Sequence, residues 1–336
     1  MIHSTIEDAP DRPHDADIAW VRRYGGPVSH SLLDASCRIF RVEGIPGFIG
    51  YSLHHHCAVA MGDPLCSPEH FADITHAFIR FCDEQQWSVI FAVASSDMRN
   101  LAGSMGAGIL EIADLLIANP QKDPLLGAKG GHLRTSVRFP LRKGVIVREY
   151  EGNRSPEPEL ETRIMAAIHN WRSNRRGFQM HIGSHQVFKN KAGCRWFLAE
   201  LEGQIVGVLY MMEIGRVGCP FMIDLVLSIP QAPPHTNELL IVSAFRQLLD
   251  EGHTAVCLGP APRAAIGEIA GLGRFSAWLA RYFYGIANRL VPQTGKAIFW
   301  KKFGISTREP LYLIFMQPHV GLREFRALLK TFNIYR

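Results

Sequence analysis

The feature that most constrains the fold is an order of elements that occurs twice: a strand, a loop, a capped helix and a second strand. The first copy spans Ala58 to Val93, and the second spans Phe221 to Leu258. In each copy, short apolar runs suited to buried strands flank a segment whose apolar residues recur at helical spacing. Strands that alternate with helices favour mixed architecture. We therefore predict an α/β fold with two similar lobes.

Local signals place the helix starts and one tight turn. In the first copy, Ser67 is suited to the N-cap and Pro68 to the first helical position. In the second copy, Thr236 or Asn237 is the expected N-cap. The dipeptide Glu202-Gly203 separates two apolar runs and therefore predicts a β-hairpin.

One segment of the chain has the composition of a boundary. The stretch from Asn153 to Glu159 is polar and contains Pro156 and Pro158. The first residues are rich in His, Asp and Pro and lack the apolar core of a signal peptide. We expect a flexible leader over residues 1–27, an N-terminal lobe over 28–152, and a C-terminal lobe over 153–336.

Composition excludes several classes of protein. No apolar run approaches the roughly 18–20 residues that a membrane-spanning helix requires. The seven cysteines form no CxxC pair, and several lie in apolar runs, so we expect reduced, buried thiols in a cytoplasmic protein.

Positive charge is concentrated in two stretches that contain no acid. These are Pro124 to Arg148 and Ile269 to Arg308, in a chain whose 31 acids leave a net charge of only +5. Such segregation, with aromatic residues interleaved, favours a polyanionic partner, either nucleic acid or an anionic lipid surface. The alternative is a pair of solvated basic faces. Tyr282, Phe283 and Tyr284 could stack on RNA bases or insert at a membrane, although core packing is the expected use of most of them.

Strand, capped helix and strand is also the layout of the acetyltransferase (GNAT-like) fold. That fold usually holds the pyrophosphate of acetyl-CoA on a Q/R-x-x-G-x-G/A turn at a helix N-terminus. The corresponding turns here, residues 62–68 and 231–236, lack the paired small residues. Pro233 and Pro234 also remove two N–H donors. We therefore expect no acetyl-CoA and no other cofactor.

A more specific resemblance follows from short motifs that occur in order from about residue 40 to residue 315. The chain resembles the soluble C-terminal catalytic domain of the multiple-peptide-resistance-factor family, the aminoacyl-phosphatidylglycerol synthases. The matching pieces are Met61-Gly62-Asp63-Pro64, Phe81-Cys82-Asp83 with Trp87, Leu126-Gly127-Ala128-Lys129 to Leu133-Arg134, Arg142-Lys143-Gly144, Gly177-Phe178, Glu202–Gly207, Asp224-Leu225-Val226, Leu258–Pro262 and Phe299–Phe303.

The resemblance implies two tandem GNAT-like lobes and an aminoacyltransferase. It implies transfer of an amino acid, lysine or alanine, from aminoacyl-tRNA to a hydroxyl of an anionic lipid such as phosphatidylglycerol. Such an enzyme would be cytoplasmic and could be peripheral at the inner face of the membrane. Full-length family members carry an N-terminal membrane flippase, which is not found in this sequence. We expect a stand-alone catalytic domain or a specialised relative.

Two other functions stay open. The family pattern has Arg three residues after its Asp, where this chain has Leu227. That departure, with the missing membrane domain, leaves room for a soluble metabolite as the acceptor in place of a lipid. A non-catalytic protein that binds tRNA or anionic lipid on the same fold is the other alternative.

Asp224 is the first candidate site residue, because it is an acid within the apolar strand Ile223-Asp224-Leu225-Val226. An unpaired charge buried there would be costly. The resemblance places Asp224 where the family holds the aminoacyl group, so it is expected to bind an ammonium. The alternative is a structural acid paired with arginine. Glu238, in the first turn of a helix, either binds substrate or only interacts with the helix dipole.

Basic residues form the second group of candidates. The resemblance places Lys301 or Lys302 at the transfer site, where one of them would contact phosphate or polarise the ester carbonyl. It assigns Arg134, Arg142 and Lys143 to phosphate binding, with a solvated face as the alternative for the last two. It also places two residues of the first lobe, Gly62 and Asp63, among the substrate-binding residues.

We expect no metal site. Three consecutive residues, His54, His55 and His56, cannot converge on one ion from a strand, because their side chains alternate between its faces. His181 and His185 are separated by Gly183 and are interpreted as loop residues, either of which could act as a general base.

Overall fold

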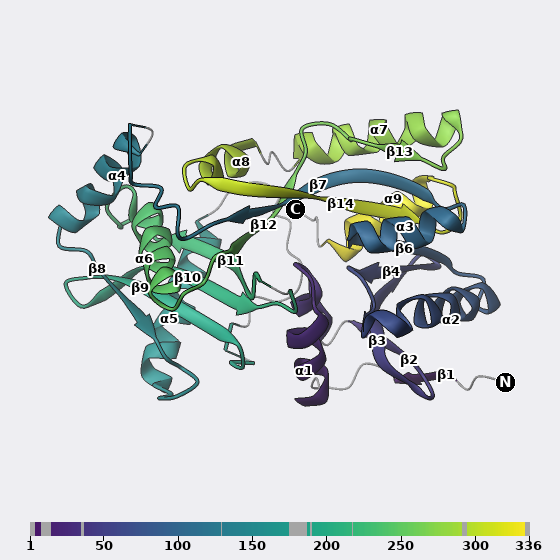
Figure 1. Cartoon of the computed structure of the whole chain (residues 1–336), viewed down its shortest axis with the longest axis horizontal. Coiled ribbons are helices and arrows are strands. Elements are labelled where there is room, and N and C mark those ends of the chain that lie inside the picture. Colours follow the sequence, from purple (N-terminus) through teal and green to yellow (C-terminus); the bar gives the residue numbers. More distant parts are fainter. Residues whose placement is uncertain are drawn as a thin grey trace.

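The computed structural model describes residues 4–7, 15–34, 37–128, 130–174, 187–188, 190–216, 218–290 and 294–332. Within these residues, fourteen strands form a continuous mixed sheet in the order β1-β2-β3-β4-β6-β14-β7-β12-β11-β10-β9-β8, with β5 beside β3 and β13 beside β7. Figure 1 shows the two halves of this sheet side by side, with helices against them. The predicted α/β fold is confirmed.

The elements of the first half, in chain order, are β1 (Ser4–Glu7), α1 (Asp15–Tyr24), η1 (Ser29–Leu33), β2 (Arg38–Val42), β3 (Ile45–His54), β4 (Cys57–Met61), β5 (Leu65–Cys66), η2 (Pro68–His70), α2 (Phe71–Glu84), β6 (Ser88–Ala94), α3 (Ser96–Ser104), β7 (Gly108–Ala118), α4 (Gly131–Arg142) and β8 (Ile146–Tyr150). Those of the second half are α5 (Pro158–Ser173), β9 (Cys194–Leu201), β10 (Gln204–Glu213), β11 (Phe221–Ser228), α6 (Thr236–Asp250), β12 (Val256–Pro262), β13 (Ile269–Ala270), α7 (Arg274–Leu290), α8 (Thr294–Lys301), β14 (Ile305–Phe315) and α9 (Leu322–Thr331).

The repeated order of elements appears in the structure as two parallel units. They are β4–α2–β6 in the first lobe and β11–α6–β12 in the second. The hairpin β9–β10 turns at Glu202 and Gly203, which both have positive φ, so the sequence signal there is confirmed. The expected Ser67 cap precedes a short 3₁₀ turn, η2, before α2 begins, and its side chain makes no capping bond.

Strand pairing does not follow the expected boundary between residues 152 and 153. Strand β8, which precedes that boundary, pairs with β9 at the far edge of the second lobe, and α4 packs against α6. Conversely, β14 lies between β6 and β7 of the first lobe. The polar segment 153–159 is therefore a surface connection within the second lobe. Each lobe is completed by chain from beyond the expected boundary.

The prediction of a flexible leader over residues 1–27 is wrong for the part that the structure describes. Strand β1 pairs with β2, and α1 packs against the first lobe with Val21 fully buried. The Asp17 carboxylate is buried as well and is paired with Arg41. Apolar residues within Asp15–Tyr24 supply a face that can pack, which the polar composition of the preceding residues obscured.

The interior is apolar on both faces of the sheet. One cluster of buried residues extends across both lobes, a second lies under α6 and α8, and a third lies under α2 and α3. The seven cysteines are buried and free, as expected. Among the described helices, none has the length and hydropathy that crossing a membrane demands.

Candidate functional site

The sheet opens between β11 and β12 of the second lobe. These parallel strands share a single register pair, Met222 with Cys257. The corresponding strands of the first lobe, β4 and β6, stay paired over Cys57–Met61 and Ser88–Ala92. Beyond Met222, β11 continues along β10, while β12 continues along β7. We call the opening between the diverging strands β11 and β12 the fork.

Asp224 lies at a bulge on one wall of the fork. Tyr210 of β10 is opposite Leu225, and Met211 is opposite Ile223, so the register between the two strands skips Asp224. A bulge turns a side chain out of the alternation of its strand. Asp224 is accordingly exposed, although the apolar strand around it predicted burial. That expectation was wrong because the alternating pattern breaks at this residue.

Side chains from three other elements, η1, β9 and β10, lie within electrostatic range of Asp224. His30 of η1 is close to the carbonyl oxygen of Glu213, with its Nε2 at 3.2 Å. Burial lowers the pKa of His30, and the contact with Glu213 and the charge of Asp224 oppose that shift. Burial raises the pKa of Cys194 to about 11, a shift that the Asp224 charge increases. The Cys194 Sγ and the Tyr210 hydroxyl are 3.0 Å apart. Asp224 thus lies within electrostatic range of the buried His30 and Cys194, in a neighbourhood that also contains the ion pair between Arg22 and Glu213.

The first turn of α6, which follows the carboxyl end of β11, brings together two of the predicted residues. The Glu238 carboxylate is buried and accepts a hydrogen bond from Lys302 Nζ at 2.9 Å. It also lies 3.2 Å from Nδ1 of His235. Burial alone would raise the pKa of Glu238, but the bonds to Lys302 and His235 bring that pKa below its usual value. Glu238 is therefore a charged partner in an ion pair and does more than interact with the helix dipole.

The structure distinguishes Lys302 from Lys301. Lys302 is held by Glu238 and lies over the ring of Phe299, with Nζ 5.1 Å from the ring centroid. Lys301 is exposed at the end of α8. The buried rings of Trp300 and Phe303 anchor this segment in the core. Lys302 is therefore the lysine that the fold positions.

Two buried polar atoms near this ion pair have no hydrogen-bond partner among the described residues. They are Oδ1 of Asn237, next to Glu238, and Nε1 of Trp300 in α8. An unsatisfied buried group costs about 1–3 kcal/mol, and such groups recur where a ligand supplies the missing bond. The helix cap differs from expectation as well, since His235 in the left-handed conformation precedes Thr236.

The three predicted phosphate-binding residues of α4 differ in environment. Arg134 is half-buried, and its Nη1 donates to the carbonyl oxygens of Leu125 and Gly127, so it closes the preceding loop. Arg142 and Lys143 are exposed at the end of the helix. The structure therefore gives Arg134 an intramolecular role and leaves the side chains of Arg142 and Lys143 accessible.

Gly62 and Asp63 lie in the first lobe and are not part of the fork. Gly62 has φ of +78° and lies against η1. The Asp63 Oδ1 accepts the backbone N–H of Ser95 at 2.9 Å, at the start of α3. Burial raises the pKa of Asp63, and its hydrogen bonds with Ser95 oppose the rise. These contacts join β4 to α3, and a substrate role for the two residues stays a prediction.

Sequence reasoning missed an ion-pair cluster beside the fork. Arg263, just after β12, donates to Asp114 at 2.8 Å and lies 2.8 Å from Glu111. Arg308 of β14 is 3.7 Å from Asp114. Asp114 is buried in β7 and opposite Ala261 of β12. Glu111 and Asp114 are acids within the apolar run of β7, and an acid within an apolar run was also the sequence signal that identified Asp224.

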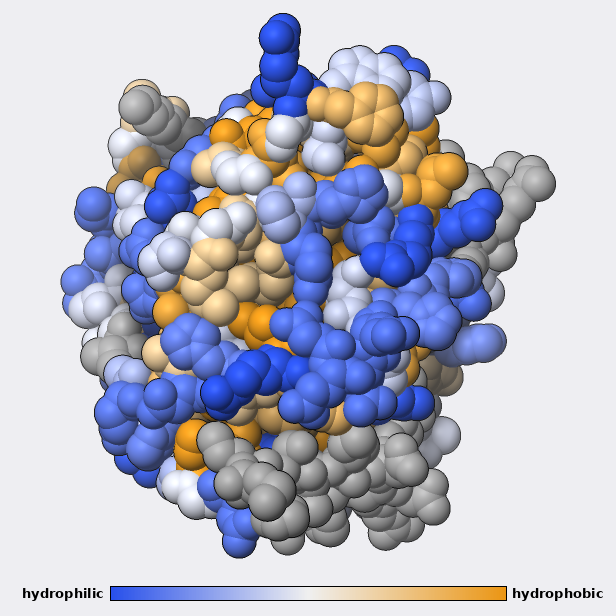
Figure 2. Space-filling view, turned by 90° about the vertical axis from the view of Figure 1, so that its right-hand side faces the viewer, coloured by the Kyte–Doolittle hydropathy of each residue, from blue (hydrophilic) through white to orange (hydrophobic). Residues whose placement is uncertain are grey.

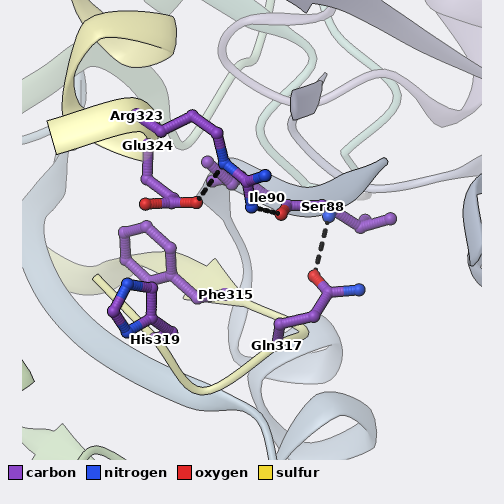
Figure 3. A pocket seen from close by; sticks show the side chains of 8 residues that line it. Ser88, Ile90, Phe315, Gln317, His319, Arg323 and Glu324 are labelled. Carbon is purple, nitrogen blue, oxygen red and sulfur yellow. Dashed lines mark hydrogen bonds and ion pairs between the residues drawn. The ribbon is translucent and has the colours of Figure 1, made fainter. Parts of the chain in front are cut away.

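A separate pocket of the first lobe lies where α9 meets β6 and β14 (Figure 3). Gln317 Oε1 accepts the N–H of Val89 at 2.9 Å, and Arg323 donates to Ser88 Oγ and to Glu324 Oε1. The side chains of Ser88, Arg323 and Glu324 are thus linked, and Gln317 bonds to the backbone of β6, so these contacts form a clamp that holds α9. The other lining residues are Ile90, Phe315 and His319.

The histidines give no metal site within the described residues, where no cluster of His, Cys, Asp or Glu could hold an ion. His55 and His56 form the tight turn between β3 and β4, and both have positive φ. His181 and His185 lie outside the described residues.

Comparison with known proteins places these features in context. Residues 21–295 match the sequence model of a family described as phosphatidylglycerol lysyltransferase, C-terminal. The chain is 27% identical over 243 residues to the lysylphosphatidylglycerol biosynthesis bifunctional protein LysX of Mycolicibacterium vanbaalenii, covering 70% of this chain and 22% of that protein. LysX of Mycobacterium tuberculosis strain H37Rv is 27% identical over 231 residues, covering 67% and 19%. The chain thus spans about a fifth of the length of these curated relatives.

Two solved structures share the fold. L-PGS from Bacillus licheniformis superposes with a TM-score of 0.78 at 19% identity, covering 98% of this chain and 100% of that one. A C-terminal domain assigned to a lysylphosphatidylglycerol synthetase of Agrobacterium fabrum gives a TM-score of 0.76 at 19% identity, covering 94% of each chain. At this identity the likeness establishes the fold alone.

Proposed function

This chain belongs to the family of phosphatidylglycerol lysyltransferase C-terminal domains, and from that premise we propose that it is an aminoacyltransferase acting on phosphatidylglycerol. The donor in this proposal is an aminoacyl-tRNA, and the amino acid is lysine. Lysine is favoured over alanine because the relatives are named for lysylphosphatidylglycerol.

The observation that carries the proposal is the fork. The sheet is open at β11–β12 and closed at the equivalent strands of the first lobe. Predicted site residues lie at this opening, with Asp224 on one wall and the Glu238–Lys302 pair at the first turn of α6. We place the extended acyl ester and its acceptor where these strands diverge, beside the charges of Asp224, Glu238 and Lys302.

The chemistry needs positioning and electrostatic stabilisation more than a covalent nucleophile. The aminoacyl ester is already activated. The glycerol hydroxyl oxygen of the lipid forms a bond to the acyl carbon, and the bond from that carbon to the tRNA ribose oxygen breaks. The hydroxyl proton ends on the released ribose oxygen. Charge develops on the carbonyl oxygen in between, where a fixed cation lowers the barrier.

We assign roles on this basis. Asp224 holds an ammonium of the amino acid, and Lys302, oriented by Glu238, faces the developing oxyanion or a phosphate. Lys301, Arg142 and Lys143 are exposed cations that attract the phosphates of the substrates. Arg134 contributes indirectly by ordering the loop before α4.

The test is transfer of radiolabelled lysine from charged tRNA to vesicles that contain phosphatidylglycerol, resolved by thin-layer chromatography. We expect labelled lipid that disappears when the tRNA is first digested with RNase. Alanyl-tRNA in a parallel reaction tests the amino acid. Label that partitions only into a water-soluble product would favour a metabolite acceptor. An absence of label in any product, from any charged tRNA, would contradict the proposal.

A further inference from the structure

Helix α7 exposes three aromatic side chains on one face. Phe275, Trp278 and Tyr282 retain 69%, 57% and 55% of their accessible surface. They follow one another at helical spacing, so they form a single outward row. Large aromatic side chains seldom stay exposed together on a surface without a partner. Figure 2 shows orange and pale side chains beside strongly blue ones at the upper edge of the molecule, the edge along which α7 lies in Figure 1.

The three rings already stack on one another. The Phe275 and Trp278 rings have centroids 6.1 Å apart and are inclined by 28°. The Trp278 and Tyr282 rings are 5.8 Å apart and inclined by 9°. Trp278 therefore stacks with a neighbour on each side, and the three rings form one continuous aromatic patch.

The same face is basic. Arg274, Arg281 and Arg289 are exposed on α7 among the aromatic side chains. The sequence has no acid from Ile269 to Arg308, so no acid of this stretch offsets their charge. The occupant that complements this face therefore combines an apolar layer with negative charge.

The opposite face of α7 is fixed in the core. Phe283 stacks on Phe325 of α9 with centroids 4.3 Å apart, and Ala280 is buried beside it. The Tyr284 hydroxyl lies within hydrogen-bond distance of two carbonyl oxygens, 2.6 Å from that of Ile112 and 2.8 Å from that of Arg263. Since these contacts fix the rotation of the helix, the aromatic row faces outward because of the fold.

We propose that the outer face of α7 is the surface by which this protein docks on an anionic phospholipid bilayer. Aromatic side chains at the level of the head groups, with arginines reaching lipid phosphates, are the composition that binds membrane interfaces. This inference rests on the proposed function, which requires a lipid substrate. Helix α8, next in the chain, lies along the same edge in Figure 1 and ends beside the Lys302 of the candidate site. Docking through α7 thus brings that site toward the lipid.

RNA is the competing polyanion, and the geometry favours it less. Single-stranded nucleic acid binds by stacking bases on open ring faces along a groove. Here the row lies on the outer surface of a helix, and Trp278 is stacked between two neighbouring rings. A bilayer needs no free ring face.

Co-sedimentation with vesicles tests the surface directly. The variant Phe275→Ser/Trp278→Ser/Tyr282→Ser is expected to bind vesicles of phosphatidylcholine and phosphatidylglycerol on the order of tenfold more weakly than the unaltered protein. Arg274→Gln/Arg281→Gln/Arg289→Gln should lose the dependence on phosphatidylglycerol. Leu322→Ser, which removes an exposed apolar side chain from α9, is the matched control and should bind normally. Thermal unfolding of each variant verifies that it folds.

Activity measurements separate this inference from the proposed function. With a water-soluble, short-chain phosphatidylglycerol, the aromatic variant should keep normal transfer and should lose it only with vesicles. Normal vesicle binding by both α7 variants would overturn the docking surface, even if the enzyme transfers lysine. Vesicle binding through α7 without any transfer would support the docking surface and contradict the proposed aminoacyltransferase activity. If the α7 variants lose tRNA binding but bind vesicles normally, the outer face of α7 binds RNA and not the bilayer.

Discussion

The Asp224 bulge shows how one residue can carry charge on an apolar strand without the cost of burial. Its neighbours Ile223 and Leu225 stay in the core on opposite faces, while the skipped register position leaves Asp224 exposed. A carboxylate fixed in this way can bind a cation without contributing to the packing of the sheet. Its loss should therefore affect substrate binding much more than stability.

Replacement of Asp224 by Asn tests this separation. A hydrogen bond to a charged group contributes about 1.5–3 kcal/mol, so we expect kcat/KM for lysyl transfer to fall by about 10- to 100-fold. The midpoint of thermal unfolding should stay close to that of the unaltered protein. Asp250→Asn, at an exposed carboxylate at the end of α6, is the control and should leave both quantities unchanged. A large loss of stability in the Asp224 variant would indicate a structural role.

Glu238 should make stability depend on pH. Its pKa in the folded protein lies below the ordinary glutamate value of 4.5, because the bonds to Lys302 and His235 outweigh burial. A lowered folded pKa contributes stability that is fully present above the unfolded value and is lost as the pH falls through the folded value. Because Lys302 is partly exposed, we expect Glu238→Gln to cost on the order of 1 kcal/mol at neutral pH.

Urea unfolding at a series of pH values checks this expectation. The difference between the unaltered protein and Glu238→Gln should be greatest above pH 4.5 and should shrink below it. Glu84→Gln, at an exposed glutamate at the end of α2, should show no such trend. A difference that is constant across the acid range would exclude the ion pair as its cause.

At the scale of elements, the diverging pair β11–β12 is what distinguishes the two lobes. Both lobes contain strand, helix and strand, but only the second opens between its parallel strands. Irregular pairing occurs on both walls of the fork, at Tyr210/Met211 on β10 and at Cys257/Gly259 on β12. These breaks let β11 stay paired with β10 and β12 stay paired with β7. The divergence of β11 from β12 therefore arises from how the backbones pair.

The clamp on α9 gives a prediction for a single helix. Glu324 is buried, accepts the N–H of Gly321 at 2.9 Å and is bonded to Arg323. Its replacement by Ala removes a helix cap and leaves partly buried donors unpaired, so we expect a loss of about 1–3 kcal/mol in urea unfolding. Arg326→Ala, at an exposed position of the same helix, should change stability little. Equal effects of both changes would mean that the clamp does not hold α9.

At the scale of the whole molecule, the two lobes depend on each other for completion. Strand β14 occupies the middle of the first lobe, between β6 and β7, although it lies near the end of the chain. Without β14, both of those strands would expose unpaired edges and apolar faces to water.

A fragment of residues 1–152 is therefore expected not to fold by itself. It should show no cooperative thermal transition in circular dichroism. Joining residues 303–332 to that fragment through a flexible linker supplies β14 and α9 and should restore a transition. A cooperative transition in the short fragment would restore the boundary between residues 152 and 153 as a true domain limit.

Short-range sequence patterns were sufficient to predict many of the helices, strands and turns. The repeated strand and helix pattern, the hairpin at Glu202-Gly203 and the buried cysteines were all predictable, because periodicity and turn chemistry act over a few residues. The motif order pointed to the family that the comparison identified. The division into lobes could not be obtained in this way, since β8 and β14 pair with strands distant in sequence.

The two acids Asp224 and Glu238 mark the limit of local reasoning. The sequence showed Asp224 as an acid among apolar neighbours and Glu238 as an acid in the first turn of a predicted helix, and both were candidates for function. Which one is exposed and which is buried depends on the bulge in β11 and on the approach of α8 to α6. Lys302 is likewise distinguished from Lys301 by Glu238, a residue 64 positions away. Amino-acid identity sets which charges exist, whereas their burial and pairing depend on long-range packing, which a local pattern does not encode.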